Sequence, residues 1–324
     1  MFLFIDADRK RLHLRRQSMS RRKIVATVIM IIALAFSVSQ LLFAQENKSG
    51  EINWVQGYIS AVGNGTADPS DNRVKDRLNA LRSAELVAQR NLLETLKGVQ
   101  IDSRTTVENL MLKEDVINSR VDGVVKGAQI VKQDVTWEKN IPLATVEIRV
   151  CLSNQVGGCN MTSSLITVLK INPQSEPPYA PADRVKPLTA PPSSPQQKQI
   201  KSIVYDTNKP VTGAIFLLDG QPFERQLLPV IITKSDKNKP LTVYSVKNVK
   251  PKVIRNYGVV RYANNEQQAK SNPYIGENAL VIPVEDITED NMIVISADAV
   301  RIIRETTMHG NDYLSDAKVV ICSN

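Results

Sequence analysis

Histidine is nearly absent from this chain of 324 residues, which contains only His13 and His309. His13 lies in a basic N-terminal segment, so a catalytic imidazole or a zinc ion held by imidazoles would depend on His309. Cysteine is also scarce, with Cys151, Cys159 and Cys322 as its three occurrences. We therefore expect a protein that is not an enzyme, with no catalytic residue, no cofactor and no metal site.

One long apolar run stands near the N-terminus. A basic cluster, Arg21-Arg22-Lys23, leads into this run, which ends at the small residue Ala44. This order is typical of an export signal, so we predict that residues 1–44 are a leader with its true start at Met19 and cleavage after Ala44. The paired arginines resemble a twin-arginine signal, but the strongly apolar core favours the general secretory route. The alternative is that residues 24–44 persist as an inner-membrane anchor, because they are about long enough to cross a bilayer.

Positive charge is concentrated in that leader. The whole chain has 41 basic and 33 acidic residues, a net charge of +8, whereas 33 basic and 31 acidic residues remain beyond residue 44. The remaining charge of +2 removes the main argument for nucleic-acid binding, so we expect no nucleic-acid partner. No cysteine lies near Ala44, which excludes a lipid anchor at the new N-terminus.

Proline marks the boundary between two domains. Eight of the 17 prolines fall in residues 173–195, among serine, glutamine and alanine. Such a composition favours an extended spacer, with a ligand for a proline-recognition groove as the alternative. We predict an α+β domain at 45–165, a proline-rich linker at 166–200 and a β-rich α+β domain at 201–324.

The first domain is predicted to pack one long helix on an antiparallel sheet. Apolar residues recur at three and four over 74–97: Val74, Leu78, Leu81, Ala84, Ala88, Leu92 and Leu96. A strand at 55–62 precedes this helix, with Gly63-Asn64-Gly65 as the intervening turn. The later pattern predicts a strand at 99–107, a shorter helix at 110–121 and a hairpin formed by 129–137 and 143–152.

The second domain shows short β runs separated by glycine, proline, asparagine or aspartate. A small helix is expected at 298–305. The predicted strands cover 214–218, 230–233, 241–246, 259–262, 279–284, 292–295 and 319–321.

Few motifs suggest a binding or catalytic site, and each of them also has a structural interpretation. Gly63-Asn64-Gly65 could cradle a phosphate, but it lacks a third glycine and favours a turn. The acidic run Glu285-Asp286 with Glu289-Asp290 could hold calcium, but it lacks the EF-hand spacing and favours a solvated loop. Asp298 near Ser296 favours a helix N-cap over a hydrolase site, because no general base accompanies it.

Cys151 and Cys159 are the candidate disulfide. In an oxidising compartment they would close a short loop in which Gly157-Gly158 permits a chain reversal. Cys322 is the competing partner. Such a bond would stabilise the fold by roughly 2 to 3 kcal/mol and would have a structural role.

Several pieces between Gly57 and Leu152 resemble the LPP-twenty lipoprotein-like family of bacterial envelope proteins, which includes a flagellar assembly protein. The pieces are the glycine pair followed by Thr66-Ala67, the helix end Leu92-Leu93-Glu94, Gly98-Val99, Ser103, Thr105, Gly123 to Ala128, and the strand Ala144 to Ile148. The segment from Thr212 to Ile321 is similar to a companion region of some exported members. It departs from that region's pattern at Leu217-Leu218-Asp219-Gly220.

The resemblance implies an α+β envelope module that associates with membranes, often assembles with itself and has no known catalysis. We therefore expect a non-enzymatic protein of the periplasm or outer-membrane periphery, as an accessory of a flagellar or surface assembly. Its expected partners are envelope proteins or a second copy of itself. The alternative is a periplasmic ligand-binding module or enzyme that uses the C-terminal domain.

Overall fold

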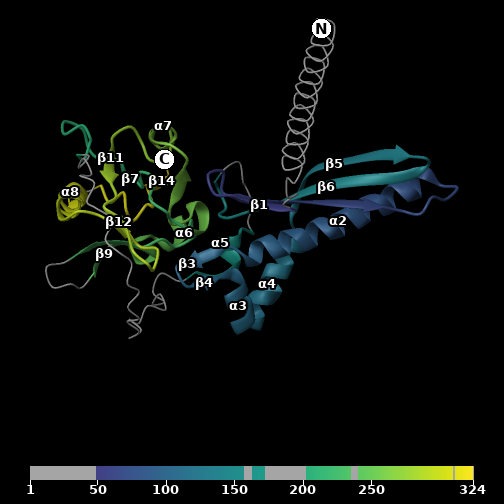
Figure 1. Cartoon of the computed structure of the whole chain (residues 1–324). Coiled ribbons are helices and arrows are strands. Elements are labelled where there is room, and N and C mark those ends of the chain that lie inside the picture. The colour runs from purple at the N-terminus through teal and green to yellow at the C-terminus, as the bar shows by residue number, and fades with distance from the viewer. Residues whose placement is uncertain (1–48, 157–162, 172–201, 235–239, 309–310, 324) are drawn as a thin grey trace, which may run out of the picture. The chain divides into compact units, whose positions relative to one another are not determined.

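The computed structural model describes residues 49–156, 163–171, 202–234, 240–308 and 311–323 (Figure 1). The predicted leader and most of the predicted linker lie outside these ranges, as does His309, so the leader and linker stay predictions. Within the described ranges, no helix is both long and apolar enough to cross a membrane. The mixed α+β class expected from the sequence is confirmed.

The first sheet is antiparallel and has the order β1-β2-β6-β5. Its strands are β1 (Gly50–Asn53), β2 (Tyr58–Thr66), β5 (Gln129–Glu138) and β6 (Ile141–Cys151). The predicted hairpin is confirmed as β5 and β6. Lys139 and Asn140 form its turn and have positive φ angles of 47° and 71°. A two-residue turn with positive φ angles matches the right-handed twist of two paired strands.

Helix α2 (Arg73–Lys97) confirms the predicted long helix and runs along one face of this sheet (Figure 1). The Asn72 side chain caps its first turn by accepting from the N–H groups of Val74 and Lys75. The buried side of α2 consists of Asp76, Ala80, Ala84, Ala88, Leu92 and Leu96. Val74 and Leu78 were expected on this side, but they are 69% and 58% exposed.

The glycine pair explains why the middle of the buried side of α2 consists of alanines. Gly63 and Gly65 do not form the predicted turn but lie inside β2, directly beneath the helix. A Cβ atom at Gly63 would overlap the backbone of Ala84 and Ala88, and one at Gly65 would overlap the backbone of Ala84. The two backbones approach too closely for a Val or Leu side chain, so the larger apolar residues turn elsewhere.

The chain between α2 and β5 forms smaller elements than predicted. The expected strand at 99–107 is a short hairpin of β3 (Gln100–Asp102) and β4 (Thr105–Thr106). The expected helix at 110–121 is two helices, α3 (Val107–Lys113) and α4 (Asp115–Lys126). Glu114 separates them because its backbone is extended, with φ −136° and ψ 104°. After β6, α5 (Leu165–Val168) contributes buried Leu165 and Ile166, at the position where the linker was expected to begin.

The second sheet is parallel throughout, which the sequence pattern did not predict. Its order is β10-β14-β7-β11, with ranges β7 (Gly213–Leu217), β10 (Arg261–Ala263), β11 (Ala279–Pro283) and β14 (Val319–Cys322). All five residues of β7 are buried, as expected for a central strand of a parallel sheet. Helices α6 (Pro251–Tyr257) and α7 (Glu266–Lys270) precede and follow β10.

The third sheet has the order β12-β13-β8-β9. Its strands are β8 (Ile231–Lys234), β9 (Pro240–Tyr244), β12 (Asp286–Ile287) and β13 (Ile293–Val294). A 3₁₀ turn (Val246–Asn248) follows β9, and helix α8 (Ala297–Met308) follows β13. The cap of α8 is Ser296 and not Asp298, because the Ser296 hydroxyl accepts from the Ala299 N–H at 3.0 Å. Asp298 lies within the first turn of the helix instead.

Two backbone hydrogen bonds connect β3 to the segment before β8. The N–H groups of Leu227 and Leu228 donate to the carbonyls of Gln100 and Ile101 at 3.0 and 2.8 Å. Leu227 thereby belongs to the hydrophobic core formed around α2. The chain around residues 226–228 therefore connects the two predicted domains.

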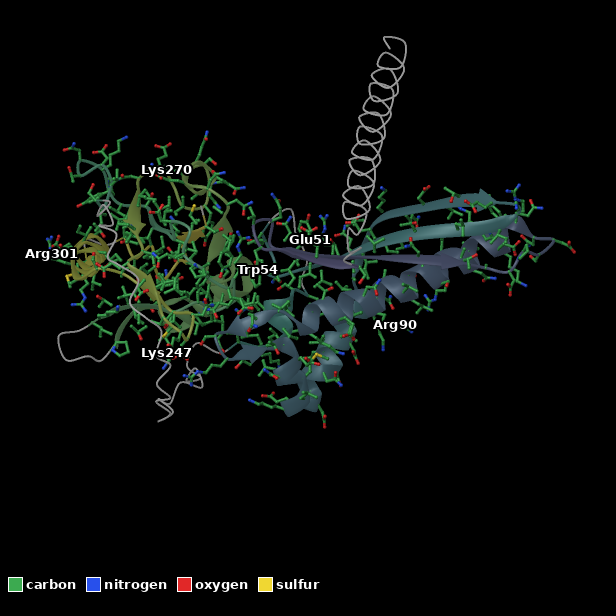
Figure 2. The ribbon with its side chains drawn as sticks, in the orientation of Figure 1. Glu51, Trp54, Arg90, Lys247, Lys270 and Arg301 are labelled. Atoms are coloured by element: carbon green, nitrogen blue, oxygen red, sulfur yellow. The ribbon has the colours of Figure 1, made fainter. Side chains whose placement is uncertain are left out.

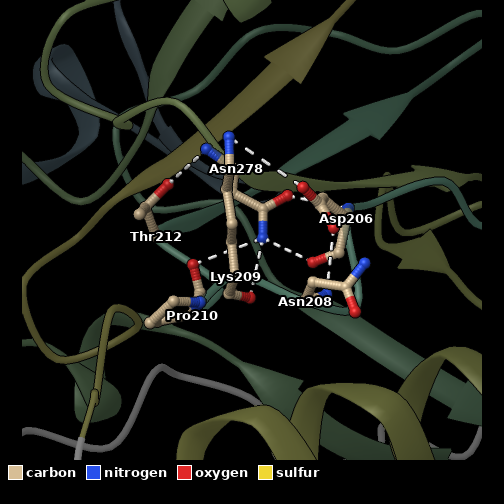
Figure 3. A network of polar contacts seen from close by, with 6 residues as sticks. All are labelled: Asp206, Asn208, Lys209, Pro210, Thr212 and Asn278. Carbon is tan, nitrogen blue, oxygen red and sulfur yellow. Dashed lines mark hydrogen bonds and ion pairs between the residues drawn. The ribbon is translucent and has the colours of Figure 1, made fainter.

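Asn278 holds the segment that leads into β7 (Figure 3). Its side-chain amide donates to the carbonyls of Asp206, Lys209 and Pro210 at 2.9, 3.0 and 3.3 Å. Its side-chain oxygen accepts from the Asp206 N–H at 2.9 Å. Asn278 is 7% exposed, so these bonds satisfy groups that water reaches poorly. One side chain thus closes the loop before the central strand.

Candidate functional site

The edge strand β5 is the most exposed regular element of the first sheet. Eight of its ten residues are exposed, and none is fully buried. β6 pairs with one side of β5, and no described strand pairs with the other side. Helix α2 covers mainly β2 and β6, so β5 projects beyond it (Figure 1). The outer side of β5 therefore has a row of backbone N–H and C=O groups with which another strand could pair.

The side chains of β5 alternate in a way that defines its two faces. Lys132, Asp134 and Thr136 lie opposite Glu147, Thr145 and Leu143 of β6, on the face away from α2. Gln133, Val135 and Trp137 lie on the helix side, where Arg73 stacks over the Trp137 ring at 4.2 Å. A bulge interrupts the pairing between Ile130 and Lys132. The regular part of the strand is therefore 132–138.

Charge is distributed asymmetrically along this regular part. Lys132 stands at its beginning and Glu138 at its end, and both are exposed. Neither forms an ion pair with another residue in the described ranges. Two antiparallel copies of such a strand place opposite charges beside each other at both ends. The alternating pattern predicted this strand, but it carried no signal that the strand lies at an edge.

The structure does not bring the candidate chemical motifs together. Gly63 and Gly65 cradle the α2 backbone, so they have no room for a phosphate. In the acidic run, Asp286 pairs with Lys234 at 3.2 Å and Asp290 pairs with Arg104 at 3.1 Å. Among the described residues, no group of three histidines, cysteines or carboxylates is placed to hold a metal ion.

The candidate disulfide stays a prediction. Cys151 is buried at the end of β6, and Cys159 lies outside the described residues. Cys322 is buried in β14, and burial raises the pKa of its thiol. We expect that alkylation of the denatured, unreduced protein modifies Cys322 alone, and that reduction exposes all three cysteines. Peptide mass mapping checks this, and alkylation of Cys151 without reduction contradicts the pairing.

A comparison with protein-family models matches the C-terminal part of the chain. Residues 205–324 match the family described as the second domain of Treponema pallidum Tp0624. The match begins before β7 and includes both C-terminal sheets, but it covers less than half of the chain. No curated protein matches the chain. The C-terminal domain is thus similar to one domain of a spirochaete protein, and that description names no activity.

Proposed function

We propose that this chain is an exported, non-enzymatic cell-envelope protein that works through protein contacts, with β5 as its contact surface. The observation that carries the proposal is the ten-residue edge strand whose outer side no described strand pairs. An exposed strand of this length is a template for the addition of another strand. The proposed partner is a second copy of the same chain.

The residues of β5 are self-complementary in one antiparallel arrangement centred on Val135. In this arrangement Lys132 lies opposite Glu138 of the second copy, and Glu138 lies opposite its Lys132. Directly opposed residues also share a face of the sheet, since the residue numbers within each pair differ by an even number. A two-fold pair of this kind joins two four-stranded sheets into one continuous sheet.

The cellular setting of the proposal comes from the sequence. The basic and apolar segment at residues 1–44 supports export to the periplasm or the outer-membrane periphery. The resemblance of residues 57–152 to the LPP-twenty family supports a role in a flagellar or surface assembly. The small net charge beyond residue 44 supports protein partners over nucleic acid.

A charge reversal on β5 tests the proposed contact. We expect Lys132→Glu and Glu138→Lys each to weaken self-association, because each places like charges opposite each other at both ends of the strand pair. Combining the two changes restores opposite charges and should restore the association. The measurement is the native mass of the protein at several concentrations, after expression of the full chain with its own N-terminal segment.

The matched control is Thr136→Lys, which adds a charge to the same strand but places it opposite Asp134 of the second copy. This variant should still associate. A concentration-independent monomer in the unchanged protein would overturn the contact. The intact mass of the same sample reports export, because cleavage after Ala44 leaves residues 45–324. A full-length product in the inner membrane would contradict cleavage.

A further inference from the structure

The side of α2 that faces away from the sheet carries three large apolar side chains. Val74, Leu78 and Leu86 are each more than half exposed. The buried residues of α2 recur at every fourth position from Asp76 to Leu96, and a position two residues away from them lies about 200° round the helix axis. These opposite positions form one row along the helix, the outer row, which consists of Val74, Leu78, Arg82, Leu86 and Arg90.

The acidic residues of this part of α2 do not neutralise its basic residues. Residues 73–90 contain five basic side chains and two acidic ones. Asp76 is buried and accepts hydrogen bonds from the Ser70 N–H and hydroxyl at 2.8 and 2.6 Å. Glu85 faces Arg82 at 3.7 Å, a distance too long for a strong hydrogen bond. The outer side of the helix therefore keeps a net positive charge.

The basic residues near the start of α2 are placed unfavourably for a helix in water. Lys75 and Arg77 lie in the first two turns, at the positive end of the helix dipole, where acidic residues are preferred. Like Arg90, which points away from the sheet, they form no ion pair with a described residue (Figure 2). Apolar and basic side chains are thus exposed together, on a side of α2 where neither kind contributes much to the fold.

The charge of the outer row decides what kind of partner fits it. The row contains no acidic residue, so a second copy of the same row would bring Arg82 and Arg90 close to the arginines of the first. A bilayer with anionic phospholipid offers negative phosphate groups beside an apolar interior. Arginine side chains suit that boundary, because their stems lie along apolar surface while the charged ends stay at the phosphates.

We propose that the outer row of α2 lies on the surface of a bilayer that contains anionic phospholipid. The three apolar side chains of the row insert at the boundary between headgroups and acyl chains. The two arginines of the row contact lipid phosphates. Lys75 and Arg77 flank the row on its two sides and add to the electrostatic attraction.

The proposed self-association would bring two such rows to the same surface. In the strand pair centred on Val135, the helix-side residues of both copies share one face, so both α2 helices lie on that face of the joined sheet. This gain rests on the proposed function, but the outer row contains no residue of β5. Lys132→Glu should therefore weaken vesicle binding without abolishing it, because a monomer contacts the lipid through one row. Equal binding would contradict the self-association and still support the lipid contact.

Cosedimentation with lipid vesicles tests the contact, with protein purified from cells that express the full chain. Vesicles of phosphatidylcholine alone are compared with vesicles in which one lipid in three is phosphatidylglycerol. We expect preferential binding to the anionic vesicles, weakening steeply as salt is added, because salt screens the attraction between charges. The N-terminal segment is the same in every variant, so any contribution from it is common to all of them.

Two double variants separate the charge of the outer row from its apolar side chains. Arg82→Gln with Arg90→Gln should weaken binding to the anionic vesicles by about tenfold or more, since each basic residue near such a surface contributes about fivefold. Leu78→Gln with Leu86→Gln should weaken it by about tenfold, because two apolar side chains no longer leave water. All four residues are exposed, and circular dichroism confirms that the variants fold.

Matched controls for both changes lie in the C-terminal domain. Lys247→Gln with Lys252→Gln removes the same amount of charge from exposed residues that form no ion pair with a described residue. Leu241→Gln with Met308→Gln removes two exposed apolar side chains. Both control proteins should bind the anionic vesicles as the unchanged protein does.

Fluorescence quenching shows which position meets the lipid. Leu78→Trp adds an indole ring to the outer row, and vesicles with bromine on their acyl chains should quench its emission, because bromine quenches at close contact. Met308→Trp is the control at a site that is 80% exposed, and its added emission should persist. Trp54 and Trp137 are present in both variants, so the signal is the difference from the unchanged protein.

The proposal is overturned if the unchanged protein does not bind the anionic vesicles, or if both row variants bind them as tightly as it does. It is also overturned if bromine quenches the Met308→Trp variant but not the Leu78→Trp variant, since another surface would then contact the lipid. Weakened binding of the row variants, with quenching of the Leu78→Trp variant alone, supports it.

Discussion

Replacing Gly63 by alanine is expected to destabilise the protein by about 3 kcal/mol or more, the upper range for overpacking a core. The added methyl group would overlap backbone atoms of Ala84 and Ala88 on α2, and backbone cannot rotate away as a flexible side chain can. The helix would have to move off the sheet. The Asn91 side chain, which donates to the Val62 carbonyl at 2.8 Å, would lose its partner in the same movement.

Gly123→Ala is the matched control for this prediction. Gly123 lies in α4, and an added Cβ atom there meets nothing within 4 Å. Alanine at this site should stabilise the protein by about 0.5 to 1 kcal/mol, because it removes the entropic cost of glycine in a helix. Urea denaturation of both variants measures the difference. Equal denaturation midpoints would show that α2 does not pack on β2 as closely as described.

Asn278→Ala is the second change for which we expect a large loss, about 3 kcal/mol. The substitution removes every hydrogen bond that the side chain makes to the loop before β7, and it leaves the carbonyls of Asp206, Lys209 and Pro210 without this donor (Figure 3). Asn278→Asp should be no better tolerated. It keeps an acceptor for the Asp206 N–H but turns a carboxylate oxygen toward the three carbonyls.

Asn208→Ala is the control in the same loop. Asn208 is exposed, and it contacts the Asp206 carboxylate through its backbone N–H, which donates at 2.9 Å and is kept in the alanine variant. Its loss should change the free energy of unfolding by less than about 0.5 kcal/mol. Thermal and urea unfolding compare the variants. If Asn278→Ala were as stable as Asn208→Ala, the network in Figure 3 would not hold the loop in solution.

The strands were predictable where their own side chains alternate. Every run predicted beyond residue 201 coincides at least in part with a strand, and β5 and β6 appear where the hairpin was expected. The elements that the pattern missed are short or depend on neighbours. β12 has two residues, and α6 begins with a proline that looks like a chain break but suits the first turn of a helix.

Two of the errors, the turn at 63–65 and the buried side of α2, have a common physical origin in the glycine pair. Locally, Gly63-Asn64-Gly65 has the composition of a turn, and Val74 and Leu78 continue the apolar spacing of α2. The close approach of α2 to β2 reverses both interpretations, since it requires glycine in the strand and alanine in the helix. A rule based on one element cannot include this requirement, because it concerns the distance between two backbones.

By itself, the sequence determined the α+β class, the long helix, the hairpin and most of the C-terminal strands, because hydrophobic period and turn residues are local properties. The tertiary structure alone decided that the second sheet is parallel and that β5 lies at an edge. Strand order and the exposure of an edge depend on residues far apart in the chain. No local pattern records which of those residues become neighbours.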